Sequence, residues 1–250
     1  MPGWHMVYQL PGARWFTARN PYPRVLALEF NLDLKTAHQH VYVKLRELIL
    51  EGVIASGERL DERALSAALG VSRTPLREAV TRLVGDGLIE HHAYQGNFVR
   101  QLDVQQVADL FDVRSALEAL AAETAVQRLT DEALTRIASA LDSACAALEM
   151  GDMTGFAAAD RSFHRIVAEC SANELLIGLL ENLDAQIQLV RVLANRDSDF
   201  TARTLAERAE ILRAFETRKG ERAAELMRRH IEDVKHTVLA QLTPDPGSDA

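Results

Sequence analysis

Residues 72–87, SRTPLREAVTRLVGDG, decide how the first half of the chain folds. Ser72 is a residue type that favours a helix N-cap, and Pro75 is tolerated in a first helical turn. The two glycines at the far end predict where this helix stops. Its apolar positions follow a helical period: Leu76, Val80, Leu83 and Val84. The opposite face then carries the polar set Arg73, Thr74, Arg77 and Thr81.

Two helices before this segment and two strands after it complete a small domain. Periodicity and glycine stops predict helices over 36–51 and 61–69 and strands over 88–91 and 97–101. Gln95 and Gly96 are the expected turn between the strands. Three short helices followed by a two-stranded wing form the winged helix-turn-helix plan, whose third helix enters the major groove of DNA.

Two arginines near the start of the third helix point to DNA contact. Arg73 and Arg77 are four residues apart, so they share one exposed face of the helix. Guanidinium groups bind guanine edges and phosphates through paired hydrogen bonds. A single exposed arginine is more often solvated surface charge, but the cap, the short turn and the wing together favour DNA binding. Arg82 lies four residues after Glu78, and a structural ion pair is the favoured interpretation there.

The rest of the chain shows only amphipathic helices. Their expected ranges are 104–128, 131–149, 153–170, 173–194, 199–218 and 220–242. The predicted fold is therefore mainly α, with an N-terminal winged helix-turn-helix domain and a C-terminal all-α six-helix bundle. The expected division is a mobile leader over 1–35, the DNA-binding domain over 36–101, the effector-binding and dimerisation domain over 102–243 and a disordered tail over 244–250.

The composition is that of a globular protein with two differently charged halves. Hydrophobic residues make up 48% and charged residues 26% of the chain, and the formal net charge is −8. The acidic excess lies after residue 101, which predicts two modules with different partners. No apolar run reaches the ~18 to 20 residues of a membrane span and no signal-peptide core is present, so we expect a cytoplasmic protein without a membrane partner. Cys145 and Cys170 are expected to be reduced core residues.

Several ionisable residues share apolar stripes in the second half, so they are expected to face inward. A buried charge without a partner costs several kcal/mol, and separate helices would not each turn charges inward unless these charges meet. One polar cavity inside the bundle is the economical interpretation. Its expected members are Asp160, His164, His230, Arg208, Arg114 and Glu118.

Residues 57–89, GERLDERALSAALGVSRTPLREAVTRLVGDGLI, with the wing glycine Gly96, resemble the GntR superfamily of bacterial transcription regulators. Helix-turn-helix proteins commonly read palindromes as symmetric dimers, so we expect a homodimer that binds a palindromic double-stranded DNA operator. The resemblance implies a transcription regulator. It also implies DNA contacts from the matching positions, with Pro75 as part of the pattern: Arg63, Arg73, Thr74, Arg77, Gln95 and Gly96.

Residues 101–240 resemble the helical FCD effector domain of the FadR-type branch of that superfamily. The matching stretches are VRSALE, DRSFH, SANELL and the closing RRH at 228–230. Many members bind a divalent metal through one aspartate and three histidines, and a small carboxylate effector completes the coordination. Here Asp160, His164 and His230 match, but Arg208 stands where a further histidine is expected.

Two hypotheses for the cavity follow from Arg208. In the first, Asp160, His164 and His230 keep a zinc, nickel or manganese ion while Arg208 binds the effector's carboxylate. In the second, Arg208 replaces the cation and pairs with Asp160 or with the anionic effector. Arg114 and Glu118 are either effector contacts or a structural ion pair beside the cavity.

The leading functional hypothesis is a ligand-responsive transcription regulator, with repression as its favoured mode, that senses a small carboxylate metabolite. One alternative is a DNA-binding protein whose helical half only dimerises. The least favoured is a metal-dependent enzyme, which would need a general base beside the metal. Glu118 is the only inward acid left for that task, and it is already placed to pair with Arg114. A non-enzymatic protein is therefore expected.

Overall fold

A computed structural model describes residues 37–194 and 198–242. The predicted leader over 1–35 and tail over 244–250 lie outside the described residues. Along the chain the elements are α1 (Ala37–Leu50), α2 (Glu62–Leu69), α3 (Arg73–Gly85), β1 (Ile89–His92), β2 (Gly96–Val99), α4 (Val104–Ala125), α5 (Asp131–Glu149), α6 (Met153–Ser171), α7 (Glu174–Ala194), α8 (Ser198–Glu216) and α9 (Gly220–Leu242). The predicted fold class is confirmed.

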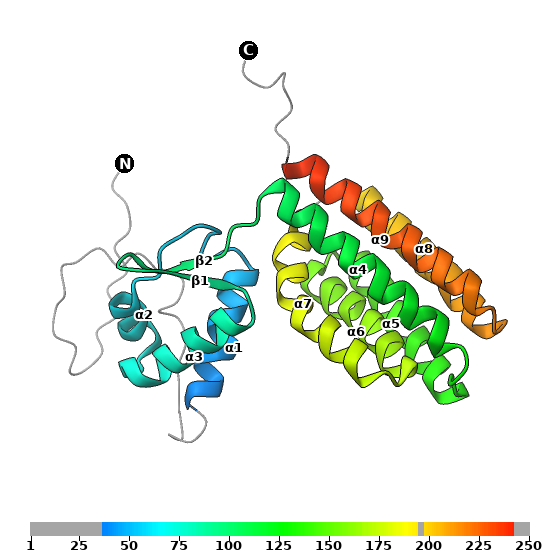
Figure 1. The fold of residues 1–250 in the computed structure, drawn as a ribbon, viewed down its shortest axis with the longest axis horizontal. Coiled ribbons are helices and arrows are strands. Elements are labelled where there is room, and N and C mark those ends of the chain that lie inside the picture. Colours follow the sequence, from blue (N-terminus) through cyan, green and yellow to red (C-terminus); the bar gives the residue numbers. More distant parts are fainter. Residues whose placement is uncertain (1–36, 195–197, 243–250) are drawn as a thin grey trace, which may run out of the picture.

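The first three helices and the hairpin form one part of the molecule, and α4–α9 form the other (Figure 1). In the first part, the apolar faces of α1 and α3 meet in a common core. Val41 and Leu45 of α1 are fully buried there, and so are Leu76 and Leu83 of the predicted apolar stripe of α3.

The start of α2 is fixed by a side-chain cap. Asp61 is its N-cap, and its carboxylate accepts hydrogen bonds from the backbone N–H groups of Arg63 and Ala64. The helix ends at Gly70, whose φ of 67° is the left-handed conformation that glycine adopts without a steric cost. Ser72 has the extended backbone of an N-cap at α3, but its side chain makes no capping hydrogen bond there.

The wing differs from the prediction by about one residue at each end. β1 and β2 pair antiparallel, with Ile89 opposite Val99 and His92 opposite Gly96. Gly96 therefore begins the second strand, with φ of 108°, and the turn lies over 93–95. Alternation of apolar and polar side chains fixes the register of a hairpin. The wing sequence is mostly polar, so no such alternation marks where its two strands begin and end.

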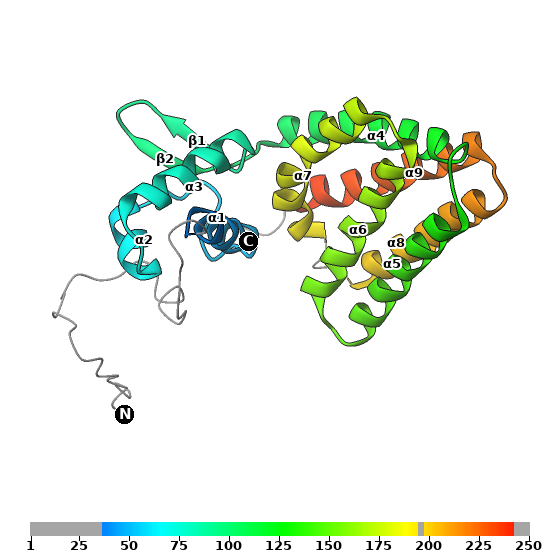
Figure 2. The same ribbon diagram turned by 90° about the horizontal axis from the view of Figure 1, so that it is seen from below.

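The second part is a six-helix bundle in which α4 and α9 pack along each other and α5 packs on α6 (Figure 2). Its core contains buried aromatic side chains from three helices, α4, α6 and α8, at Phe111, Phe163, Phe200 and Phe215. The two cysteines are free, as predicted, and only Cys170 packs against this core. Cys145 is exposed and Cys170 is partly exposed. None of the helices in the described ranges is long and apolar enough to cross a membrane.

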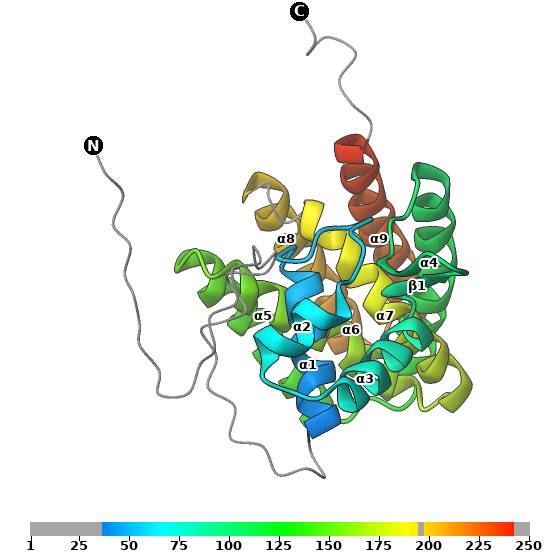
Figure 3. The same cartoon turned by 90° about the vertical axis from the view of Figure 1, so that its left-hand side faces the viewer.

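Helix α7 is the part of the bundle that faces the DNA-binding domain (Figures 1 and 2), and Figure 3 shows α1–α3 in front of the bundle when viewed from that end. Ala185 and Leu189 of α7 join the apolar core of the smaller domain. A guanidinium N–H of Arg46 on α1 donates to the carboxylate of Asp184 on α7 at 3.1 Å. The two parts are therefore joined by packing as well as by the chain.

The two caps predict different effects on stability. Asp61→Ala removes two capping hydrogen bonds and should lower the free energy of unfolding by about 1 kcal/mol. Ser72→Ala removes no capping hydrogen bond and should change the free energy of unfolding by less than about 0.5 kcal/mol. Chemical denaturation followed by circular dichroism measures both values. An equal loss in the two variants would contradict this assignment of the caps.

Candidate DNA-binding surface and effector cavity

The residues predicted to contact DNA lie on one side of the smaller domain. Arg63, Arg73, Thr74, Arg77 and Gln95 are exposed, and Pro75 and Gly96 are partly exposed. A groove of about 410 Å³ lies between α2, the start of α3 and the wing, and its lining includes Arg63, Arg73, Arg77 and Gly96. The structure thus brings these predicted positions together, and their role in DNA binding stays a prediction.

Arg59 also lines this groove and was not predicted. It precedes α2 and forms an isolated β-bridge with Phe98 of the wing. The basic residue in GERL was a visible signal, but nothing in a single sequence places the segment before α2 against the second strand of the wing.

Glu62 holds Arg77 and the wing in fixed positions. Its carboxylate accepts from Nε of Arg77 at 3.1 Å and from the side-chain amide of Asn97 at 3.1 Å. Asn97 in turn lies 3.0 Å from Nδ1 of His91. One acidic side chain of α2 therefore links the third helix to the wing and orients the Arg77 guanidinium.

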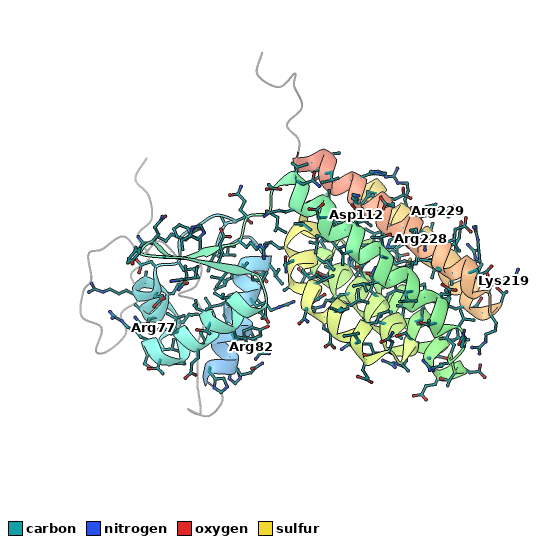
Figure 4. The ribbon with its side chains drawn as sticks, in the orientation of Figure 1. Arg77, Arg82, Asp112, Lys219, Arg228 and Arg229 are labelled. Atoms are coloured by element: carbon teal, nitrogen blue, oxygen red, sulfur yellow. The ribbon has the colours of Figure 1, made fainter. Side chains whose placement is uncertain are left out.

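Arg82 has a structural role, but with a different partner from the predicted Glu78. Its guanidinium donates to Gln39 at 2.7 Å and lies 3.9 Å from the centre of the Tyr42 ring. The Tyr42 hydroxyl donates to Asp86 at 2.7 Å. Arg82 therefore joins α3 to α1, whereas Arg77 points away from the body of the domain (Figure 4).

Inside the bundle, the six inward-facing residues predicted from the stripes are buried, and Asp160, Arg208 and His230 are completely inaccessible. They form a connected cluster of charges on α4, α6, α8 and α9. At one side, Nε of Arg114 donates to Glu118 at 2.7 Å. The second carboxylate oxygen of Glu118 is bonded to Nδ1 of His164. Arg114 and Glu118 are thus an ion pair that also contacts the aspartate–histidine helix.

Asp160 lies between two arginines. Nη1 of Arg208 is 2.6 Å from one carboxylate oxygen, and Arg191 forms an ion pair with the other. Arg208 is also held by α8 itself, because its Nε donates to the backbone oxygen of Thr204 at 3.0 Å. Arg191 is on α7 and was not predicted as a cavity residue.

The two histidines stack on each other, with ring centroids 5.5 Å apart. Nδ1 of His230 lies 2.7 Å from the carboxylate of Glu207, so each ring has a carboxylate at Nδ1. The Nε2 atoms of both rings are buried and make no hydrogen bond with any described residue. Ligand-type atoms of Asp160, His164 and His230 all lie within 4.8 Å of one another.

Burial and neighbouring charges set the protonation of this cluster. Burial would raise the pKa of Glu118, but Arg114 and His164 outweigh it and hold that pKa at about 2. Burial lowers the pKa of His164, and burial together with His164 and Arg208 lowers that of His230 well below its usual value. Both rings are therefore neutral at neutral pH, and Glu118 is ionised.

A divalent cation fits the histidines but not the whole donor set. A carboxylate at Nδ1 fixes the tautomer that leaves Nε2 free to bind a metal. Asp160, however, already has a guanidinium on each carboxylate oxygen. Three buried arginines face the two buried carboxyl groups of Glu118 and Asp160. Burial raises the pKa of Glu207, beside His230, to about 7, so this group adds at most part of a negative charge, and an added cation would meet an excess of positive charge. Asp160, His164 and His230 would hold the ion only if the arginines released Asp160.

A cavity of about 380 Å³ opens beside this cluster between α4, α6 and α7. Arg114, Glu118, His164 and Arg191 line it next to the cluster. Further polar side chains of α6 and α7 complete the lining together with apolar ones: Arg161, Ser162, Arg165, Glu181, Asp184 and Gln188. Arg208 and His230 are not among its lining residues, because they lie deeper in the bundle. The sequence suggested Arg208 as the arginine that lines the cavity. In the structure Arg191 lines it instead.

A three-helix domain with a wing and an exposed arginine face, joined to a helical bundle with a charged cavity, is the build of a DNA-binding regulator with a second, helical domain. Comparison with known proteins agrees. Residues 37–99 match the bacterial regulatory proteins of the gntR family, and residues 109–233 match the FCD domain. The chain belongs to the GntR family and carries an FCD domain, as the sequence resemblance implied.

Relatives with known names are transcription regulators. The HTH-type transcriptional regulator YdhC of Bacillus subtilis is 31% identical over 219 residues, which cover 87% of this chain and 93% of YdhC. The HTH-type transcriptional repressor RspR of Escherichia coli is 27% identical over 201 residues, covering 80% of this chain and 88% of RspR. A solved GntR structure from Rhodococcus sp. RHA1 is 29% identical, with a TM-score of 0.71 and coverage of 82% of this chain and 98% of that one. These similarities indicate a transcription regulator and not an enzyme.

Because Asp160 is already paired, we expect little metal in the native protein. Chain purified without a histidine tag should contain well under one zinc, nickel or manganese ion per molecule, as measured by mass spectrometry of the elements. The melting temperature should be the same with and without EDTA. Arg208→His removes one positive charge and supplies a further imidazole, so this variant should retain more metal than the wild type. Stoichiometric metal in the untagged wild type would contradict the charge argument.

Proposed function

We propose that the chain is a ligand-responsive repressor of transcription, which binds a palindromic operator as a homodimer and senses a small carboxylate. The observation that carries the DNA-binding assignment is the groove lined by Arg63, Arg73 and Arg77 beside the wing. Acting on the chromosome, such a regulator would be cytoplasmic. The name of RspR as a repressor supports the proposed direction of regulation.

In this proposal the third helix enters the major groove. Arg73 and Thr74 in the first turn of α3 reach base edges, and Arg77, oriented by Glu62, reaches a base or a phosphate. Arg63, Gln95 and Gly96 bind the backbone on either side, and Pro75 keeps the first turn rigid. Exposure of all the charged members of this set supports the assignment.

A two-fold dimer is proposed because helix-turn-helix proteins read palindromes with two heads. The outer face of α4 supports it. Val113 and Leu120 are exposed large apolar residues seven positions apart on this helix. Charged residues of α4 and α9, among them Asp112, Arg228 and Arg229, lie on the same side of the bundle (Figure 4). An apolar centre with a charged rim is the usual make-up of a protein interface.

The effector is proposed to bind in the cavity beside Arg114 and Glu118, with Arg208 holding Asp160 in place of a resident metal. Buried guanidinium groups in a small cavity favour an anionic ligand. The cavity also distinguishes this proposal from a helical half that only dimerises, since a dimerisation module has no need for buried charges lining a hollow.

Helix α7 is proposed to transmit effector binding to the DNA-binding domain. It contributes Arg191 to the cavity, and it contributes Ala185, Leu189 and Asp184 to the contact with the smaller domain. A ligand that binds Arg191 would thus bias the position of a helix on which the DNA-binding head packs.

The DNA-binding assignment is tested by Arg73→Ala and Arg77→Ala. Operator fragments selected from genomic DNA are titrated with each variant in a fluorescence anisotropy assay at fixed salt. Each substitution should weaken operator binding by about 1 to 3 kcal/mol and relax base preference at one position. Arg136→Ala on α5 is the matched control, because it removes an exposed arginine of the bundle. Wild-type affinity in either α3 variant would refute the assignment for that residue.

A further inference from the structure

We propose that Tyr94, at the tip of the wing, is a further DNA-contacting residue, whose ring enters the minor groove next to the major groove that α3 occupies. This inference rests on the proposed DNA-binding function and adds an uncharged contact to its arginines. Tyr94 is not among the positions that the sequence pattern marks for DNA contact.

The ring of Tyr94 lies outside the fold. Its exposed fraction, 107% of the reference value, is the largest among the exposed large apolar residues of the described ranges. The ring makes no hydrogen bond or ring contact with any described residue. Figures 1 and 2 show the tip of the hairpin directed away from the helical bundle, so the bundle does not cover it. The fold therefore gains no stabilisation from this ring.

The backbone of Tyr94 adopts a conformation that tyrosine rarely takes. Its φ is 63°, in the left-handed region, where the Cβ atom is crowded by the carbonyl oxygen that follows. The turn is closed by the backbone N–H of Gln95, which donates to the carbonyl oxygen of His92 at 3.1 Å. Glycine or asparagine is the residue type that such a turn favours. Backbone strain of this kind is found mainly at functional sites.

The wing holds this tip in a fixed position relative to α3. The segment before α2 runs along β2, where the backbone N–H of Leu60 donates to the carbonyl oxygen of Asn97 at 2.8 Å. The side chain of Asn97 is bonded to Glu62, which also holds Arg77. The tip and the arginine of the third helix are therefore connected, so Tyr94 approaches DNA together with α3.

The charges around the tip favour DNA as the partner. The turn and first strand residue at 93–96 carry no acidic side chain. Arg59 lies beside them, since its Nε atom is 3.4 Å from the place that a Cβ atom on Gly96 would occupy. Its guanidinium lines the same groove as Arg63 and Arg73. This edge of the wing therefore attracts a phosphate strand.

The dimensions of DNA place a minor groove within reach of the wing. The major groove is bordered on each side by one phosphate strand and then by a minor groove. The minor groove is about 6 Å wide, which admits one aromatic ring but not a helix. Its walls are deoxyribose rings with apolar C–H groups, and apolar side chains of many DNA-binding proteins enter it. An uncharged ring beside a basic edge suits this groove better than it suits a phosphate.

The test measures operator binding by the full-length chain in a fluorescence anisotropy assay, with operator fragments that the wild type selects from genomic DNA. Tyr94→Asn removes the ring but keeps a residue type that tolerates the left-handed conformation. This variant should bind the operator at least about fivefold more weakly, the lower end for aromatic contacts with nucleic acid. Tyr94→Phe keeps the ring and should bind within about twofold of the wild type.

Three further readouts separate a DNA contact from a change in the fold. The slope of log affinity against log salt should be the same in Tyr94→Asn as in the wild type, because no phosphate contact is lost. Arg63→Ala should reduce the magnitude of this slope by about one. Hydroxyl-radical footprints should lose protection of the minor groove beside each half-site in Tyr94→Asn. The melting temperature of this variant should not fall, because the ring makes no contact within the fold.

Met150→Asn is the matched control, because Met150 is an exposed apolar residue at the end of α5 in the helical bundle. It should bind the operator like the wild type. Wild-type affinity and an unchanged footprint in Tyr94→Asn would overturn the proposal. Equal losses in Tyr94→Phe and Tyr94→Asn would also overturn it, since the hydroxyl would then make the contact.

The outcomes separate this inference from the proposed function. If the wild type selects no operator from genomic DNA, the proposed function itself fails. If Arg73→Ala and Arg77→Ala weaken operator binding while Tyr94→Asn does not, only the role of Tyr94 is overturned.

Discussion

The burial of Asp160 between Arg191 and Arg208 is the constraint on which the rest of the sensing domain depends. A carboxylate at the centre of a helical bundle is tolerated only when its charge is compensated. Here the compensation comes from α7 and α8, while α6 supplies the aspartate itself. The position of α7 is therefore tied to the charge balance of the core. Removing a counter-charge from Asp160, or adding one, therefore affects the packing energy of the whole α7 helix and not only that of one side chain.

That helix also has a second partner, the DNA-binding domain. Ala185 and Leu189 belong to the apolar core of the winged domain, and Asp184 bonds to Arg46. One helix thus borders both the charged cavity and the DNA-binding domain. Coupling between two sites requires an element whose equilibrium both sites bias. In the described structure α7 is the helix placed to act in this way, because it contacts the DNA-binding domain and lines the cavity.

The sequence predicted the architecture and most of the buried cluster, because helical periodicity places Asp160, His164, Arg208 and His230 among apolar residues that face inward. It missed Arg191 for a physical reason. Helix α7 packs against the bundle on one side and the DNA-binding domain on the other, so apolar residues surround it and no single stripe marks the cavity side. The sequence also did not predict contacts between side chains of different helices. Arg82 donates to Gln39 of α1 instead of pairing with Glu78 on its own helix. Cys145 lies on an apolar stripe of α5 but is exposed, since the stripe is wider than the surface that α6 and α8 cover.

The measurement that tests this account most directly is the operator affinity of the wild-type protein and of Arg191→Gln, which removes the guanidinium that α7 supplies to Asp160. Fluorescence anisotropy at one fixed salt concentration gives both dissociation constants. The account predicts that the substitution changes operator affinity at least about fivefold, the lower range of allosteric coupling energies. If Arg191→Gln folds and binds the operator with wild-type affinity, the link between cavity and DNA-binding domain through α7 is contradicted.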